Sequence, residues 1–168
     1  MKALHQLDQG VAWLLKGIVL LSFFGLFLLL GFGVVQRSFP ALNISGYEEL
    51  IDLLFVWLGF AGTAALWREG ALYRVGAFDK IWRLGMRRAI SFIIHLLMLS
   101  LLWVLVVVGT DFTLNAGETT PFLQANKIYW YMAIPSTSLV MTAYSFVAIY
   151  RLWKDPAYVE HQEMSTLG

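Results

Sequence analysis

The sequence has no cysteine and few charged residues for its length. The absence of cysteine excludes a disulfide framework, thiol catalysis and cysteine-ligated metal. Charged residues make up 14% of the 168 residues, whereas a typical soluble domain has about 25%. Apolar residues take their place: 59% of the chain is hydrophobic, and the mean hydropathy is +0.68. This composition indicates an integral membrane protein, and no stretch resembles a nucleic-acid-binding motif.

Four mainly apolar runs have the length of about 20 residues that a helix needs to cross a bilayer. They cover residues 17–36, 46–67, 89–110 and 128–150. The sequence therefore predicts an all-α membrane protein with four transmembrane helices in one domain, residues 1–168. The first run is longer than the apolar core of a signal peptide and lacks a matching cleavage site, so we interpret it as a span.

Two further segments are amphipathic at helical spacing. In the N-terminal segment the apolar face consists of Leu4, Leu7, Val11 and Leu14, with Trp13 as an interfacial anchor. In residues 68–88 the apolar face consists of Leu72, Val75, Phe78, Ile81, Trp82 and Gly85. Amphipathic helices of this kind lie in the headgroup plane. The sequence predicts two such interfacial helices, and an ordinary basic loop is the alternative for each.

The orientation follows from the distribution of Lys and Arg, which gather on the cytoplasmic side of membrane proteins. Ten of the twelve flank the N-terminus, the 68–88 segment and the C-terminus. The other two are Arg37 and Lys127. This division predicts that both termini and the 68–88 segment are cytoplasmic and that the two remaining loops are outside.

The second predicted helix has charged residues at both ends. Ser45 and Glu48 have the spacing of a capping box at its start. We interpret the charged residues at the two ends as candidate contacts with a partner subunit: Glu48, Glu49, Asp52, Arg68, Glu69 and Arg74. For the carboxylates there are two alternatives to a partner contact. They could cap the helix and be hydrated, or they could bind a cation.

Few other residues in the spans offer chemistry. His95 is the one ionisable residue well inside a predicted span, and it lacks the second histidine that a haem would need, since His5 and His161 lie outside. Pro135 predicts a kink in the last helix because it cannot donate a backbone hydrogen bond. Hydroxyl residues follow it on one face: Ser138, Thr142 and Ser145. We interpret this stripe as packing rather than a substrate path, and predict no catalytic, cofactor or metal site.

Two groups of residues resemble a known family. One is Glu48-Glu49-Leu50 with the "VWL" core at 56–58 and "REG-x-x-x-RV" at 68–75; the other is Thr119-Thr120-Pro121 with the proline-containing 131–135. With the four-span topology they resemble the small membrane subunit of a TRAP transporter, the DctQ-like family. The chain departs from the family pattern at Leu72, Tyr73 and Gly76, where relatives usually carry His and Asp.

The resemblance implies a bacterial inner-membrane protein that works with a large multi-helix subunit and an extracytoplasmic substrate-binding protein. It implies secondary transport, driven by a sodium gradient, of an organic acid such as a sialic acid or a dicarboxylate. The small subunit would then be a scaffold that packs against the large subunit and membrane lipid. Two other functions stay open from the residues alone: a small redox or cytochrome-like membrane subunit, and a stand-alone small exporter.

Overall fold

The computed structural model describes residues 2–39, 45–70, 72 and 84–154. Four helices in this part of the chain are long and apolar enough to cross a membrane, namely Gln6–Ser38, Tyr47–Arg68, Ala89–Asn115 and Ile128–Tyr150. No strand occurs among the described residues; one isolated bridge joins Thr119 and Asn126. The all-α fold class with four transmembrane helices is therefore confirmed.

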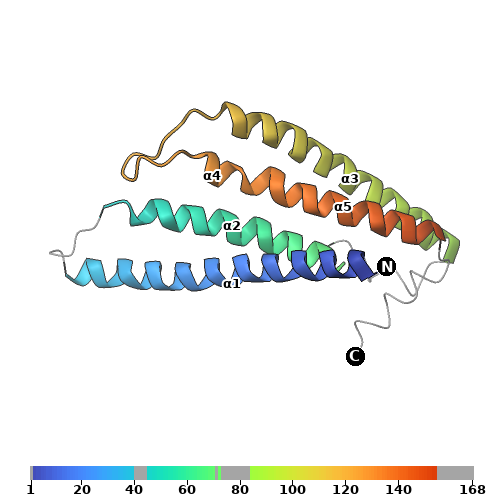
Figure 1. Ribbon diagram of the computed structural model, residues 1–168, viewed down its shortest axis with the longest axis horizontal. Coiled ribbons are helices and arrows are strands. Elements are labelled where there is room, and N and C mark those ends of the chain that lie inside the picture. The colour runs from blue at the N-terminus through green and yellow to red at the C-terminus, as the bar shows by residue number, and fades with distance from the viewer. Residues whose placement is uncertain (1, 40–44, 71, 73–83, 155–168) are drawn as a thin grey trace.

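The four spans are arranged as two antiparallel helix pairs, α1 (Lys2–Ser38) with α2 (Tyr47–Arg68) and α3 (Leu84–Asn115) with α5 (Ala133–Lys154). The pairs meet along α2 and α5, so the helices form the row α1–α2–α5–α3 (Figure 1). The core lies where α1, α2 and the second pair come together, and its buried members are Leu15, Ala61, Ala64, Trp67, Leu102 and Met141. Small alanines on α2 let the neighbouring helices approach closely there.

The N-terminal segment is helical, but it does not form a separate interfacial helix as predicted. It continues without interruption into the first span, so that α1 is a single helix of 37 residues. Residues 6–16 contain no helix-breaking proline, and Asp8 pairs with Arg68 at the end of α2. This pairing holds the segment against α2. The continuous helix replaces the separate one that was predicted, and the position of the segment in the headgroup plane stays a prediction. The second predicted interfacial helix lies mostly outside the described residues, and residues 84–88 belong to α3.

The fourth span is interrupted near its start. A short helix, α4 (Ile128–Tyr131), is followed by a turn at Met132 and then by α5. Pro135 lies in the first turn of α5, where helix N–H groups have no intrahelical acceptor and proline is tolerated. The interruption falls three residues before the proline, and the kink predicted at Pro135 stays a prediction.

The start of α2 differs from the predicted capping box. The N-cap residue is Gly46 rather than Ser45, and no side chain caps the helix. Gly46 has φ of +93°, a left-handed conformation that glycine adopts at little cost. A Cβ atom at this position would lie 3.1 Å from the Cβ of Phe122 in the loop before α4. The approach of that loop, rather than a local cap, determines how α2 begins.

Replacing Gly46 with alanine should destabilise the protein by about 1–2 kcal/mol, because a non-glycine residue is strained in the left-handed region and would press on Phe122. Unfolding in mixed detergent micelles measures the effect. Gly117→Ala is the matched control, since nothing lies within 4 Å of a Cβ added there. Equal stability of the two variants would contradict this account of the turn.

Candidate functional site

A polar cluster joins three helices at the end of α2 that carries Arg68. The Arg68 guanidinium donates two hydrogen bonds to the Asp8 carboxylate, from Nε at 2.8 Å and from Nη2 at 2.6 Å. The Tyr144 hydroxyl donates a third to the same carboxylate, at 2.7 Å. The three residues come from α1, α2 and α5. Bidentate pairing of this kind fixes orientation as well as contributing energy, so the cluster sets how the first helix pair meets the second.

Two tryptophans of α2 attach it to the fourth span. The Trp67 indole donates to the Ser145 hydroxyl at 2.9 Å in a buried contact, and Ser145 in turn donates to the carbonyl of Met141. Nearer the other end, the Trp57 indole donates to the carbonyl of Tyr129 at 3.0 Å. A buried indole N–H needs such a partner. These bonds make α2 the helix that connects the two pairs.

The hydroxyl stripe on α5 is buried, and two of its three hydroxyls bond within the protein while the Ser138 Oγ has no hydrogen-bond partner among the described residues. Thr142 donates to the carbonyl of Ser138 at 2.7 Å, while Ser145 links Trp67 to Met141. Ser138, Thr142 and Ser145 are all buried in the packing between helices. The contacts of Thr142 and Ser145 agree with the interpretation of the stripe as packing, because both hydroxyls are buried and hydrogen-bonded.

The loop before α4 is a short hairpin held by charged groups. Glu118 and Lys127 form an ion pair of 2.9 Å across its base, and the Tyr131 hydroxyl donates to Glu118 at 3.2 Å. The lysine lowers the pKa of Glu118, and the carboxylate raises the pKa of Lys127, chiefly through their hydrogen bond. The Glu49 carboxylate accepts from the backbone N–H groups of Phe122 and Leu123, at 2.8 and 3.0 Å. Glu49 thus holds the tip of this hairpin against α2.

The six charged residues predicted as partner contacts are therefore separated by the structure. Two of them bind within the chain, Arg68 to Asp8 and Glu49 to the hairpin. Three of them are exposed: Glu48, Asp52 and Glu69. Arg74 lies outside the described residues. No observation tests docking by any of the six, so the partner contact stays a prediction, and Asp8 and Tyr144 join the list of residues that position α2.

His95 is buried, and its Nδ1 lies 2.7 Å from the carbonyl of Ser91. Gly109 of α3 packs against Ile134 and Pro135 of α5. In the antiparallel pair, His95 therefore lies near the level of Ala148, toward the end of the span that carries Tyr144. His95 lies six residues from the start of the span Ala89–Asn115. Among the described residues, no group of three or more His, Asp or Glu side chains is placed to hold a metal ion.

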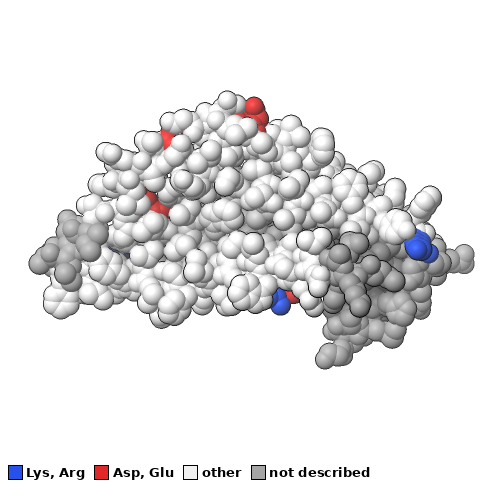
Figure 2. Space-filling model, viewed as in Figure 1, with Lys and Arg blue, Asp and Glu red and all other residues white. Residues whose placement is uncertain are grey.

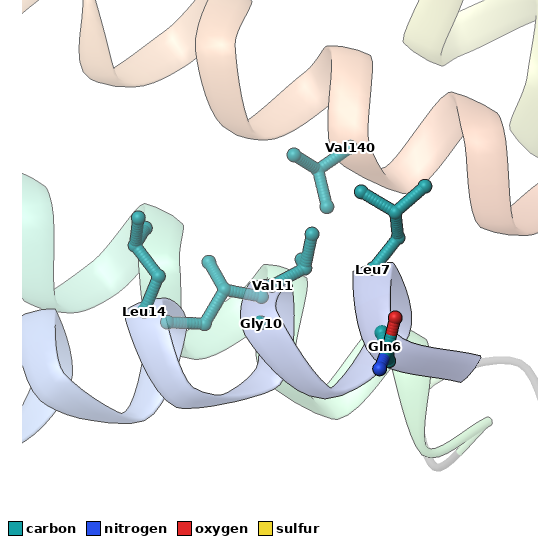
Figure 3. A pocket seen from close by; sticks show the side chains of 7 residues that line it. Gln6, Leu7, Gly10, Val11, Leu14 and Val140 are labelled. Carbon is teal, nitrogen blue, oxygen red and sulfur yellow. The ribbon is translucent and has the colours of Figure 1, made fainter. Parts of the chain in front are cut away.

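An apolar groove of about 770 Å³ opens between the start of α1 and α5. Figure 3 shows Leu7 and Val11 of α1 facing Val140 of α5 across it. Its lining has one polar side chain, Gln6, and no charged one. A charged substrate would lose its hydration in such a groove without gaining a counter-charge, which is costly. The groove therefore suits apolar matter, such as a lipid chain.

These features define the class of protein. Four helices long and apolar enough to cross a membrane, joined by a polar cluster, indicate a multi-pass membrane protein. Residues 26–155 match the family "Tripartite ATP-independent periplasmic transporters, DctQ component", and the chain belongs to this family. The family is one component of a transporter that also comprises a large membrane subunit and a substrate-binding protein.

Comparison with individual proteins gave no match, either to curated proteins or to solved structures. The family match covers the start of α2, the hairpin and Pro135, which carry the resemblance noted in the sequence, but it begins after Asp8. The partner of Arg68 thus lies outside the matched range.

The cluster at Arg68 generates a quantitative prediction. Alanine replacements of Asp8 and Arg68, alone and together, should reveal a coupling energy of about 1–2 kcal/mol in the free energy of unfolding. The side chains are 35% and 23% exposed, so the value falls between that of a surface pair and that of a fully buried pair.

The matched control combines Asp8→Ala with Lys16→Ala. Lys16 is exposed and lies eight residues farther along α1, about 12 Å from Asp8 along the helix axis, so the two substitutions should add. A coupling near zero for the Asp8–Arg68 pair would show that the cluster does not fix the helices.

Proposed function

We propose that this chain is the small membrane subunit of a secondary transporter that is driven by a sodium gradient and carries an organic acid of the sialic acid or dicarboxylate class. In this proposal the chain holds no substrate or ion site and acts as a scaffold for the large membrane subunit. An extracytoplasmic substrate-binding protein delivers the substrate. The family match supports the assignment to a transporter. The sodium dependence and the substrate class are parts of the proposal that go beyond this match.

The observation that carries the scaffold role is the contrast between the surface and the interior of the spans. Large apolar side chains remain exposed along α1 and α3, among them Phe24 and Phe27 of α1 and Trp103 and Val108 of α3. Uncharged side chains also cover most of the face shown in Figure 2. The Asp, Glu, Lys and Arg residues of the described spans lie within about two turns of a span end, with the exception of Lys16 in the first span. An intramembrane site for an anion and sodium needs helix ends or charges near the midplane, whereas packing needs apolar surface.

The proposed location is the bacterial inner membrane, with both termini in the cytoplasm. The charge division between the two ends of the spans supports this orientation. In that orientation the Asp8–Arg68–Tyr144 cluster lies at the cytoplasmic side and the 118–127 hairpin lies outside, where the substrate-binding protein approaches.

The orientation is tested by single thiols, since the chain has no cysteine of its own. Asn115→Cys, at the end of α3, should react with an impermeant maleimide added to intact cells. Lys154→Cys, at the end of α5, should react only after the cells are opened. Reaction of both positions from the same side would refute the four-crossing orientation.

The scaffold role is tested by uptake into proteoliposomes that contain this chain, the large subunit and the substrate-binding protein under an imposed sodium gradient. His95→Ala should keep uptake within about twofold of the unmodified chain, because the histidine is engaged with its own helix and contacts no substrate. Liposomes that lack this chain are the control and should show no uptake. A change of substrate preference or sodium dependence caused by His95→Ala would overturn the proposal.

A further inference from the structure

One face of α2 is left uncovered although α2 is an inner helix of the row. The helix contacts α1 on one side and α5 on the other. Between these contacts, exposed residues recur every three or four positions along its whole length: Glu48, Asp52, Phe55, Gly59, Thr63 and Leu66. At 100° per residue they lie within an arc of roughly 80°. They are called the free face of α2 below.

The middle of the free face is shaped for close approach of another helix. A groove of about 320 Å³ surrounds Gly59 and is lined by Phe55, Val56, Phe60 and Thr63. Nothing lies within 4 Å of a Cβ added at Gly59. The Thr63 hydroxyl already donates to the Gly59 carbonyl at 2.7 Å. A helix packed over Thr63 would therefore not leave this donor without an acceptor. Small residues four apart, with their polar groups satisfied, are typical of helix contacts in membranes.

One end of the free face is negatively charged. Glu48 and Asp52 are one turn apart and exposed, and no ion pair within the described part of the chain involves either of them. Their neighbour Glu49 points instead to the hairpin, which it binds through two backbone N–H groups. The free face therefore offers two carboxylates at the end that carries Gly46 and apolar surface beyond them. A complementary partner would carry Lys or Arg at that level.

From this arrangement we propose that the free face of α2 is the surface on which the large membrane subunit docks, through a transmembrane helix that has a basic residue at its outer end. The proposal rests on the proposed function, and it specifies the surface through which this chain would bind the large subunit. Glu48 and Asp52 fix the register of the docked helix, since complementary charges determine orientation more than affinity. Gly59 allows the two helix backbones to meet.

Two other occupants fit this face less well. A second copy of the chain, related by a two-fold axis along the membrane normal, would bring Glu48 and Asp52 against their own equivalents, and like charges repel. A phospholipid would place its phosphate at the level of the two carboxylates, which is also repulsive. A helix has its backbone hydrogen bonds satisfied within itself and can carry the required positive charge.

The first test is recovery of the large subunit, co-expressed with this chain and captured through a tag on it. Gly59→Leu should reduce recovery by about tenfold, because a bulky side chain prevents close approach of the helices. Gly31→Leu on α1 is the matched control, since Gly31 is also exposed with open space around it; it should leave recovery unchanged. Undiminished recovery with Gly59→Leu would overturn the docking face while leaving the proposed function standing. Failure of the unmodified chain to recover the large subunit would overturn the function itself.

A second test does not depend on how well the Gly59 variant folds. The photo-reactive residue p-benzoylphenylalanine is placed at Phe55 or at Phe27 of α1, which are equally exposed at 68%. At Phe55 it should cross-link the large subunit at least about tenfold more than at Phe27. Cross-links from Phe55 to a second copy of the chain, to lipid alone, or to the large subunit at the level seen from Phe27 would each contradict the proposal.

Discussion

The carboxylate of Asp8 is the group on which the arrangement of the helices depends most. It accepts two hydrogen bonds from Arg68 and one from Tyr144, and so joins α1, α2 and α5 at one level. Within the membrane, apolar surface gives helices little preference for one another over lipid. Polar contacts and close packing must therefore determine which helices meet. The Trp67–Ser145 bond adds a second such contact, and together they make α2 the helix that connects the two pairs.

A row of helices leaves much of each helix available to other molecules. The groove beside Val11, the exposed aromatic residues of α1 and the groove at Gly59 on the free face of α2 are mainly apolar. They differ in detail, because large side chains dominate the exposed part of α1 while α2 combines Gly59 with carboxylates at one end. Lipid covers any apolar surface, whereas a partner subunit requires a specific shape and charge. In the proposal above, this difference separates the docking face from the surface that lipid covers.

The sequence predicts the spans because each of them is an apolar run of sufficient length, and this property is local. Prediction from the sequence fails where contacts between residues far apart in the chain determine the local structure. Gly46 replaces the expected cap because the hairpin at Phe122 packs against it. The N-terminal segment lies against α2, where Asp8 contacts Arg68, sixty positions away. Glu48 and Glu49 look equivalent in sequence, yet Glu49 binds the hairpin and Glu48 stays exposed. The candidate contacts could be listed from sequence, but their roles could not be assigned.

The central claim is that this chain supports a transporter without binding what the transporter carries. The most direct measurement is equilibrium binding of radioactive sodium and of a panel of labelled organic acids to the purified chain alone, and then to its complex with the large subunit. The account predicts no saturable binding to the chain alone and saturable binding, with sodium and one acid class coupled, to the complex. Saturable, sodium-dependent binding of an organic acid to the chain alone would contradict it.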